Sequence, residues 1–284
     1  MRLASGIPAA LLDSTLELLF PGHDTVTVVV EKPTGGSHEI GQIHLYEEAA
    51  YLMFVHPGHL ECVADACNLL EGLVRQAGER GAHYLLAAIE ESNSIHYGLR
   101  QTGFRQAYTQ KVWQVSPGQL PGKQNELRWR TAGERDYFSL ASLYPQCVPT
   151  GLQPILPLKK NHLPDFILMT DRDVKGYAYL HRYPRAVFLY PYVSPALADM
   201  PVALASLIRS VAVHPKIFVV IPSFQGWLES ARTRLAATTV MKQQILVKPI
   251  ALWQKSAQPV RTRLAVNGQR SETSTPLAPS SKGE

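Results

Sequence analysis

The stretch "SNSIHYGLRQTGFRQ" at residues 92–106 has the pattern of a short helix that ends at Gly103 and continues as a strand through Phe104. Glycine tolerates the left-handed backbone conformation in which helices commonly end. The preceding run "HYLLAAIEE" (83–91) is apolar enough for a buried strand. The segment therefore predicts a strand, a helix and a further strand, in that order.

The residues before this segment predict three more strands and another helix. "TVTVVVEK" (25–32) and "EIGQIHLYEE" (39–48) flank a Pro-Thr-Gly-Gly turn, which indicates a hairpin. "AAYLMFVHPG" (49–58) is a third, apolar strand. Apolar residues then recur at spacings of three and four over 61–77, which indicates an amphipathic helix. With the strand at 105–115, the first half has the order β-β-β-α-β-α-β.

The second half repeats this order after a segment rich in Pro and Gly. The expected elements are a hairpin at 165–182, an apolar strand at 186–195, a helix at 201–213, a buried strand at 216–224, a helix at 225–237 and a last strand at 240–253. Two copies of one unit in register indicate a tandem duplication. We expect an α/β fold with a mixed sheet, made of two domains (1–115 and 127–253), a linker (116–126) and a disordered C-terminal tail (254–284).

Composition and charge narrow the class of protein. The chain has 284 residues, of which 45% are hydrophobic and 18% charged, so it can bury a sizeable core. It has no run of about 18 apolar residues that could span a membrane. Its start is interrupted by Asp13 and Glu17, unlike a secretory signal. The net charge of +5 is spread along the sequence without a basic stripe. We expect a cytoplasmic protein that does not bind nucleic acid.

Cysteine and histidine usage gives no metal site. Cys62, Cys67 and Cys147 have no C-x-x-C spacing, and buried thiols are the favoured interpretation. His56 and His59 flank a Pro-Gly pair but lack a third ligand nearby. We therefore expect no bound metal.

The order of elements resembles the acyl-CoA-binding core of the GCN5-related N-acetyltransferase superfamily. The resemblance rests on the strand end "VHP" (55–57) and on the closing "GLRQTGF" (98–104), which in that family leads out of the last helix into the hairpin that completes the sheet. "LRWRTAGERDYFSLASLY" (127–144) is similar to the first strand and helix of the same fold. The resemblance covers residues 10–253 and implies two tandem domains of this type. It also implies acetyl-CoA, or another acyl-CoA, as the cofactor.

The resemblance places the cofactor at the end of the strand at 49–58. There, Val55 and His56 are followed by Gly58 and His59, which stand where the family has a glycine-rich turn for the CoA pyrophosphate. Backbone N–H groups at a helix start bind anions, and glycine allows close approach. Asn93 is a further CoA contact in this interpretation, or alternatively an N-cap of the last helix.

Two departures weaken the expected phosphate site. Glu61 and Asp65 place negative charge near the phosphates in the first half. The corresponding stretch of the second half, "SPALADMP" (194–201), has neither a glycine nor a basic residue. We therefore expect any surviving CoA site in the first half.

The candidate catalytic residues are Glu48 and Tyr97. In the family a tyrosine of the last helix often protonates the leaving thiolate, but Leu99 occupies that position and cannot donate a proton. Tyr97 lies two residues earlier and is the nearest candidate acid; its alternative role is packing. Glu48 is a candidate base for the amine, and its alternative is a solvated strand end.

Three functions remain open. The first is an acyl-CoA-dependent N-acyltransferase that acts on an amine of a small molecule or peptide, with any active site in the first domain. The second is a non-catalytic tandem binding or scaffold protein that has lost acyl-CoA chemistry. The third is a tRNA-dependent aminoacyl transferase, which the lack of a basic stripe disfavours.

Overall fold

The structure, a computed structural model, describes residues 25–31, 38–46, 48–56, 63–93, 95–120, 127–170 and 173–250. The strands of the first half are β1 (Thr25–Glu31), β2 (His38–Tyr46), β3 (Ala49–His56), β4 (Tyr84–Glu90) and β5 (Arg105–Val115). Those of the second half are β6 (Trp129–Thr131), β7 (Phe166–Thr170), β8 (Asp173–Tyr183), β9 (Ala186–Val193), β10 (Ile217–Pro222) and β11 (Thr238–Pro249). The helices are α3 (Val63–Glu79), α4 (Ile95–Gln101), α5 (Tyr137–Cys147), α6 (Met200–Ser210) and α7 (Ala231–Arg234). The expected mixed α/β fold is confirmed.

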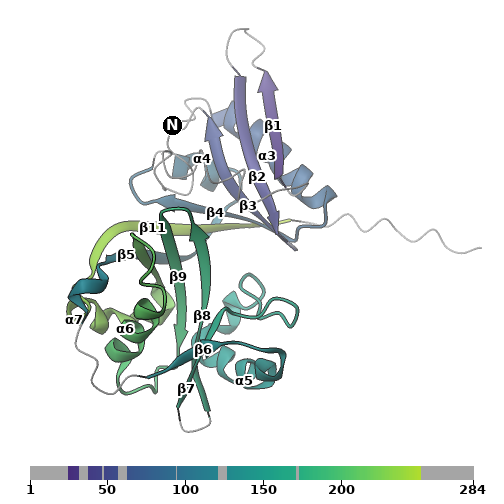
Figure 1. The fold of residues 1–284 in the computed structure, drawn as a ribbon. Coiled ribbons are helices and arrows are strands. Elements are labelled where there is room, and N and C mark those ends of the chain that lie inside the picture. Colours follow the sequence, from purple (N-terminus) through teal and green to yellow (C-terminus); the bar gives the residue numbers. More distant parts are fainter. Residues whose placement is uncertain are drawn as a thin grey trace, which may run out of the picture. The chain divides into compact units, whose positions relative to one another are not determined.

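All these strands belong to one sheet, in which the two halves exchange their last strands (Figure 1). The strand order is β1-β2-β3-β4-β11-β5-β10-β9-β8-β7-β6. The buried strand β4 of the first half therefore pairs with β11 of the second half, along its whole length. Reciprocally, the buried strand β10 of the second half pairs with β5 of the first half. The last strand of each half thus completes the sheet of the other half.

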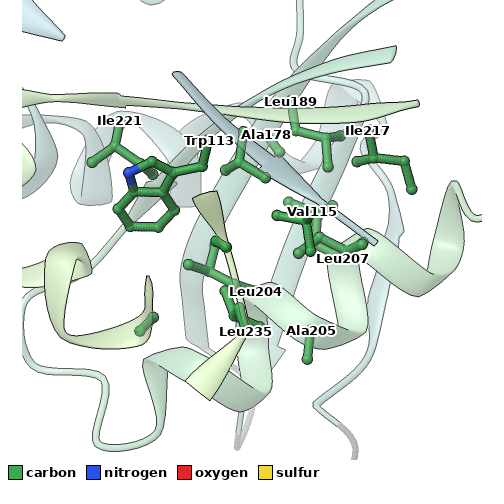
Figure 2. Close-up of a cluster of buried hydrophobic side chains, with 14 of the residues drawn as sticks. Trp113, Val115, Ala178, Leu189, Leu204, Ala205, Leu207, Ile217, Ile221 and Leu235 are labelled. Carbon is green, nitrogen blue, oxygen red and sulfur yellow. The ribbon is translucent and has the colours of Figure 1, made fainter. Parts of the chain in front are cut away.

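The exchanged strand β5 contributes to the core of the second half. Figure 2 shows Trp113 and Val115 of β5 among Leu204 and Leu207 of α6 and Ile217 of β10. Trp113 is fully buried. Burying a large aromatic side chain contributes about 3 kcal/mol through the hydrophobic effect. The packing therefore ties the first half of the sequence to the second.

The two faces of the sheet are covered differently. Side chains of α3, α4, α6 and α7 pack on one face, which we call the α3 face. Leu140 and Leu143 of α5 pack on the opposite face, the α5 face, against Tyr177 of β8. Because strand residues alternate between faces, Leu86 of β4 and Ile245 of β11 also lie on the α5 face.

The repeat predicted from the sequence is visible in the turn that closes each last helix. Gly103 has a φ of 88°, and the Phe104 N–H donates to the Leu99 carbonyl over 3.0 Å. In the second half Ala236 takes the same left-handed conformation, with a φ of 49°, and the Ala237 N–H donates to the Arg232 carbonyl over 3.0 Å. The second copy thus keeps the turn without the glycine.

One predicted helix is wrong in part. Residues 225–237 were expected as a single helix, but Ser223–Ser230 form 3-10 turns (η4), and only Ala231–Arg234 are α-helical. Gln225 has φ −109° and ψ 41°, which lie outside helical values. Its side chain hydrogen-bonds to the backbone of Val193 and Pro191 in β9.

The described residues all fall within one compact unit. The division into domains at the linker 116–126 stays a prediction, and the tail predicted at 254–284 lies outside the described residues. Cys147 is buried, as expected for a structural thiol, and Cys67 is half-buried. None of the described helices is long and apolar enough to cross a membrane.

Candidate functional site

The parallel strands β3 and β4 pair at one end and diverge at the other. Ala49–Tyr51 of β3 pair with Tyr84–Leu86 of β4, and the pairing of these two strands ends there. Beyond this point β3 continues beside β2 as far as His56, while β4 continues beside β11 as far as Glu90. Among the described strands, none pairs with the facing edges of β3 and β4 along this stretch. We call this divergence the first fork, and the last shared rung, Tyr51 with Leu86, its apex.

A bulge lies immediately beyond the apex. The β2–β3 register passes from Ile43 opposite Leu52 to Gln42 opposite Phe54, so that Met53 is the extra residue. A bulge bends its strand and interrupts regular pairing. It therefore marks the point at which β3 turns away from β4.

The predicted CoA contacts that the structure describes gather at the open end of the first fork. His56 is exposed at the end of β3, and Val55 is buried in the core beneath α3. Asn93 follows the end of β4, and its Oδ1 accepts the Ile95 N–H over 3.1 Å. The side chain thus caps the start of α4, as the alternative interpretation held. Gly58 and His59, which carry the predicted phosphate turn, lie outside the described residues.

The two predicted catalytic residues lie apart from each other. Glu48 sits at the paired end of the first fork, where its carbonyl accepts the His83 N–H over 2.7 Å and its exposed carboxylate lies 3.9 Å from His83 Nδ1. It is separated from His56 by the length of β3, about 23 Å at about 3.3 Å per residue. Tyr97 lies on α4 with 62% of its surface exposed, whereas Leu99 of the same helix is fully buried. The structure therefore does not bring Glu48 and Tyr97 into one cluster.

The second half contains an equivalent divergence, the second fork, formed by β9 and β10. These strands pair only between Val187–Leu189 and Ile217–Val219. Val187 points its N–H toward β10, where it donates to the Lys216 carbonyl over 2.9 Å. Because backbone groups two residues apart on a strand point the same way, Pro191 and Val193 present theirs to the second fork.

Side chains from η4 occupy this edge of the second fork. The Val193 N–H donates to Gln225 Oε1 over 3.0 Å, and Gln225 Nε2 donates to the Pro191 carbonyl over 2.8 Å. Trp227 Nε1 donates to the Val193 carbonyl over 3.1 Å. Gln225 is completely buried. The primary amide therefore makes both contacts that an amide of a ligand would make with the same edge.

The first fork has no such insertion among the described residues. No described side chain hydrogen-bonds to the backbone of Leu52–His56. Asn93 follows β4 at the position where Gln225 follows β10, three residues after the strand end. Its side chain is one methylene shorter and turns back to α4 instead of crossing to β3. The two forks thus differ in whether the chain itself fills them.

Sequence reasoning missed the role of Gln225. It fell within an expected helix, where a glutamine is ordinary. The available signal was that Gln225 occupies the position in the second half that Asn93 occupies in the first. A longer amide side chain therefore stands where a ligand contact was predicted.

Comparisons with known proteins agree on the fold. No family model and no curated protein matches the sequence. Among solved structures, a GCN5-related N-acetyltransferase from Kribbella flavida aligns with a TM-score of 0.56 and 16% identity, over 86% of this chain and 96% of that chain. Another GCN5-related N-acetyltransferase, from Sphaerobacter thermophilus, aligns with a TM-score of 0.54 and 14% identity, over 86% of both chains. A functionally unknown conserved protein from Staphylococcus epidermidis aligns with a TM-score of 0.55 and 9% identity, over 74% of this chain and 91% of that chain. Because the first two alignments span both halves, the chain has the tandem fold of the GCN5-related N-acetyltransferases.

Proposed function

We propose that this protein is an acyl-CoA-dependent N-acyltransferase whose acyl-CoA lies in the first fork. The observation that carries the proposal is the contrast between the two forks: the second is filled by Gln225 and Trp227, whereas no described side chain fills the first. An extended ligand binds such an edge as an added strand would, through backbone hydrogen bonds. The pantetheine arm of CoA has two amide groups that suit this mode.

The open end of the first fork suits the phosphates. α3 begins after β3 and is 17 residues long, so its start carries a partial positive charge. Gly58 and His59 stand just before it in the sequence, and we expect them to contact the pyrophosphate. The second half has no glycine or basic residue at the matching positions.

The reaction we propose is attack of an amine nitrogen on the thioester carbonyl. The nitrogen–carbon bond forms, the carbon–sulfur bond breaks, and the amine loses a proton while the CoA sulfur gains one. The acceptor is an amine on a small molecule or peptide. Glu48 as the base and Tyr97 as the acid stay predictions. We expect the protein in the cytoplasm, because acyl-CoA is an intracellular metabolite.

The alternative is a binding protein that has kept the first fork without the chemistry. The position of Leu99 favours it, because this buried aliphatic residue stands where the family often has its proton donor. The exposure of Tyr97 favours it as well, since a phenol directed to solvent does not protect a leaving thiolate from water.

Acetyl-CoA should stabilise the native protein. A ligand that binds only the folded state raises its stability by mass action, so 1 mM acetyl-CoA should raise Tm by about 5 °C. Thermal shift, with adenosine monophosphate as the control ligand, measures this. Release of CoA thiol with primary amines such as tyramine and spermidine then separates the two functions. A thermal shift without thiol release indicates a protein that binds acyl-CoA without the chemistry. The absence of a shift contradicts the acyltransferase and favours a binding or scaffold protein that has lost acyl-CoA altogether.

A further inference from the structure

The length of the first fork places a bound thioester at its apex, and this inference rests on the proposed function. The unpaired edge of β3 runs from Leu52 to His56, and from the apex at Tyr51 to His56 it measures five residue steps, about 16 Å at about 3.3 Å per residue. The pantetheine arm, when extended, lies along this edge in the way an added strand would. With the pyrophosphate beyond His56, the arm ends beside Tyr51 and Leu86.

The α3 face is closed around the apex. Ala50 and Leu52 of β3 and Leu85 and Ala87 of β4 are all buried, and they pack with α3 and α4 in one core. An amine cannot reach the thioester through this core without displacing it. The acceptor must therefore arrive from the α5 face.

Tyr51 is the polar side chain at the apex on that face. It pairs in register with Leu86, whose side chain lies on the α5 face, and neighbours in register share a face. Its side chain is 37% exposed, so it reaches solvent at the point where the acceptor arrives. The phenol thus lies on the route to the thioester.

Two of the other tyrosines on this face, Tyr108 and Tyr190, are poorer proton donors. Tyr108 of β5 lies on it opposite Ile245, and Tyr190 of β9 packs on it with Phe218. Burial, with a smaller contribution from the neighbouring Tyr51 phenol, raises the pKa of Tyr108 far above its usual range. Burial likewise raises the pKa of Tyr190. Both phenols therefore stay neutral, and a proton leaves them only at a high cost.

We propose that Tyr51 donates its phenolic proton to the sulfur of CoA as the carbon–sulfur bond breaks. The electron pair of that bond stays on sulfur, which takes the proton, and the tyrosinate regains a proton from the ammonium formed by the attacking amine. A thiol has a pKa of about 8.5 and a phenol one of about 10, close enough for this transfer. Tyr51 thereby replaces the donor that Leu99 cannot provide.

The test compares three tyrosine-to-phenylalanine variants. The reaction is thiol release from acetyl-CoA with hydroxylamine, a nucleophile small enough for any acceptor site. Tyr51→Phe should lower kcat by about 100-fold, the usual contribution of a general acid. It should leave the Kd of acetyl-CoA within twofold, and it should remove the fall of kcat at alkaline pH. Tyr84→Phe is the matched control, because Tyr84 lies on the same face two rungs nearer the paired end, and its kcat should be unchanged.

The outcomes separate this inference from the proposed function. If Tyr51→Phe retains the kcat and the alkaline limb of the wild type, Tyr51 is not the acid; the same effect in Tyr97→Phe instead would assign the role to α4. A merely structural role of Tyr51 would lower Tm or raise the Kd of acetyl-CoA without moving the pH profile, and that also overturns the inference. Absence of acetyl-CoA binding or of thiol release in the wild type contradicts the proposed function itself, and this inference with it.

Discussion

A chain shortened to residues 1–237 should fail to fold in either half. It lacks β11, which pairs with β4 over seven residues and with β5 over nine. It also lacks Leu246, which is fully buried in the core beneath α3 and α4. Ordinary domains are stable by only about 5–15 kcal/mol, so the loss of a central strand exceeds the available stability. We expect no cooperative thermal transition by circular dichroism.

A chain of residues 1–252 is the control, since it keeps the whole of β11. It should melt within about 2 °C of the full protein, because it keeps the pairing of β11 with β4 and β5. Hydrogen exchange then shows whether the first half stays folded in the shortened chain. If residues 1–237 retained slow exchange at the amides of β4, the exchanged strand would not be needed for the first half, and the account of the fold would be wrong.

Gln225→Ala should destabilise the protein by about 3 kcal/mol, because it leaves the Val193 N–H and the Pro191 carbonyl without partners in a buried site. For a chain of this size that lowers Tm by about 8 °C. Urea unfolding followed by tryptophan fluorescence measures the change in free energy of unfolding.

Gln153→Ala is the matched control for this variant. Gln153 is half-buried and donates a single side-chain hydrogen bond, over 3.1 Å, to the Val148 carbonyl. Its loss should cost about 1 kcal/mol. Equal costs for the two variants would mean that Gln225 does not hold the second fork, and the contrast between the forks would lose its energetic basis.

Much of the fold was predictable because local patterns specify it. The spacing of Leu70, Leu73 and Ala77 predicts α3, and all three are buried there. Gly103 predicted the end of α4 because its left-handed conformation suits glycine. The exchange of β5 and β11 was not predictable in this way. Both strands carry the same pattern, and periodicity specifies that a strand forms without specifying which neighbour it pairs with.

The candidate site was predicted less completely. The sequence placed the candidate cofactor site at the end of the strand "VHP", which lies at the open end of the first fork, and the capping role of Asn93 was one of two stated alternatives. Gln225 was missed because its two hydrogen-bond partners, Val193 and Pro191, lie 32 and 34 positions earlier in the sequence, and because it sits in an irregular turn. Tyr51 was passed over because it lies in an apolar run, and only the register of β3 with β4 places it at the apex.

Titration calorimetry of acetyl-CoA tests the central claim most directly, because it counts the sites. The account predicts one molecule per chain. Gly58→Asp, which puts a negative charge by the expected pyrophosphate, should weaken binding at least about tenfold, since like charges about 4 Å apart repel by about 1 to 4 kcal/mol. Ala196→Asp makes the same change one residue after the matching proline of the second half, at an exposed position, and should leave binding unchanged. Two molecules per chain, or binding lost in Ala196→Asp and kept in Gly58→Asp, would contradict the assignment of the site to the first fork.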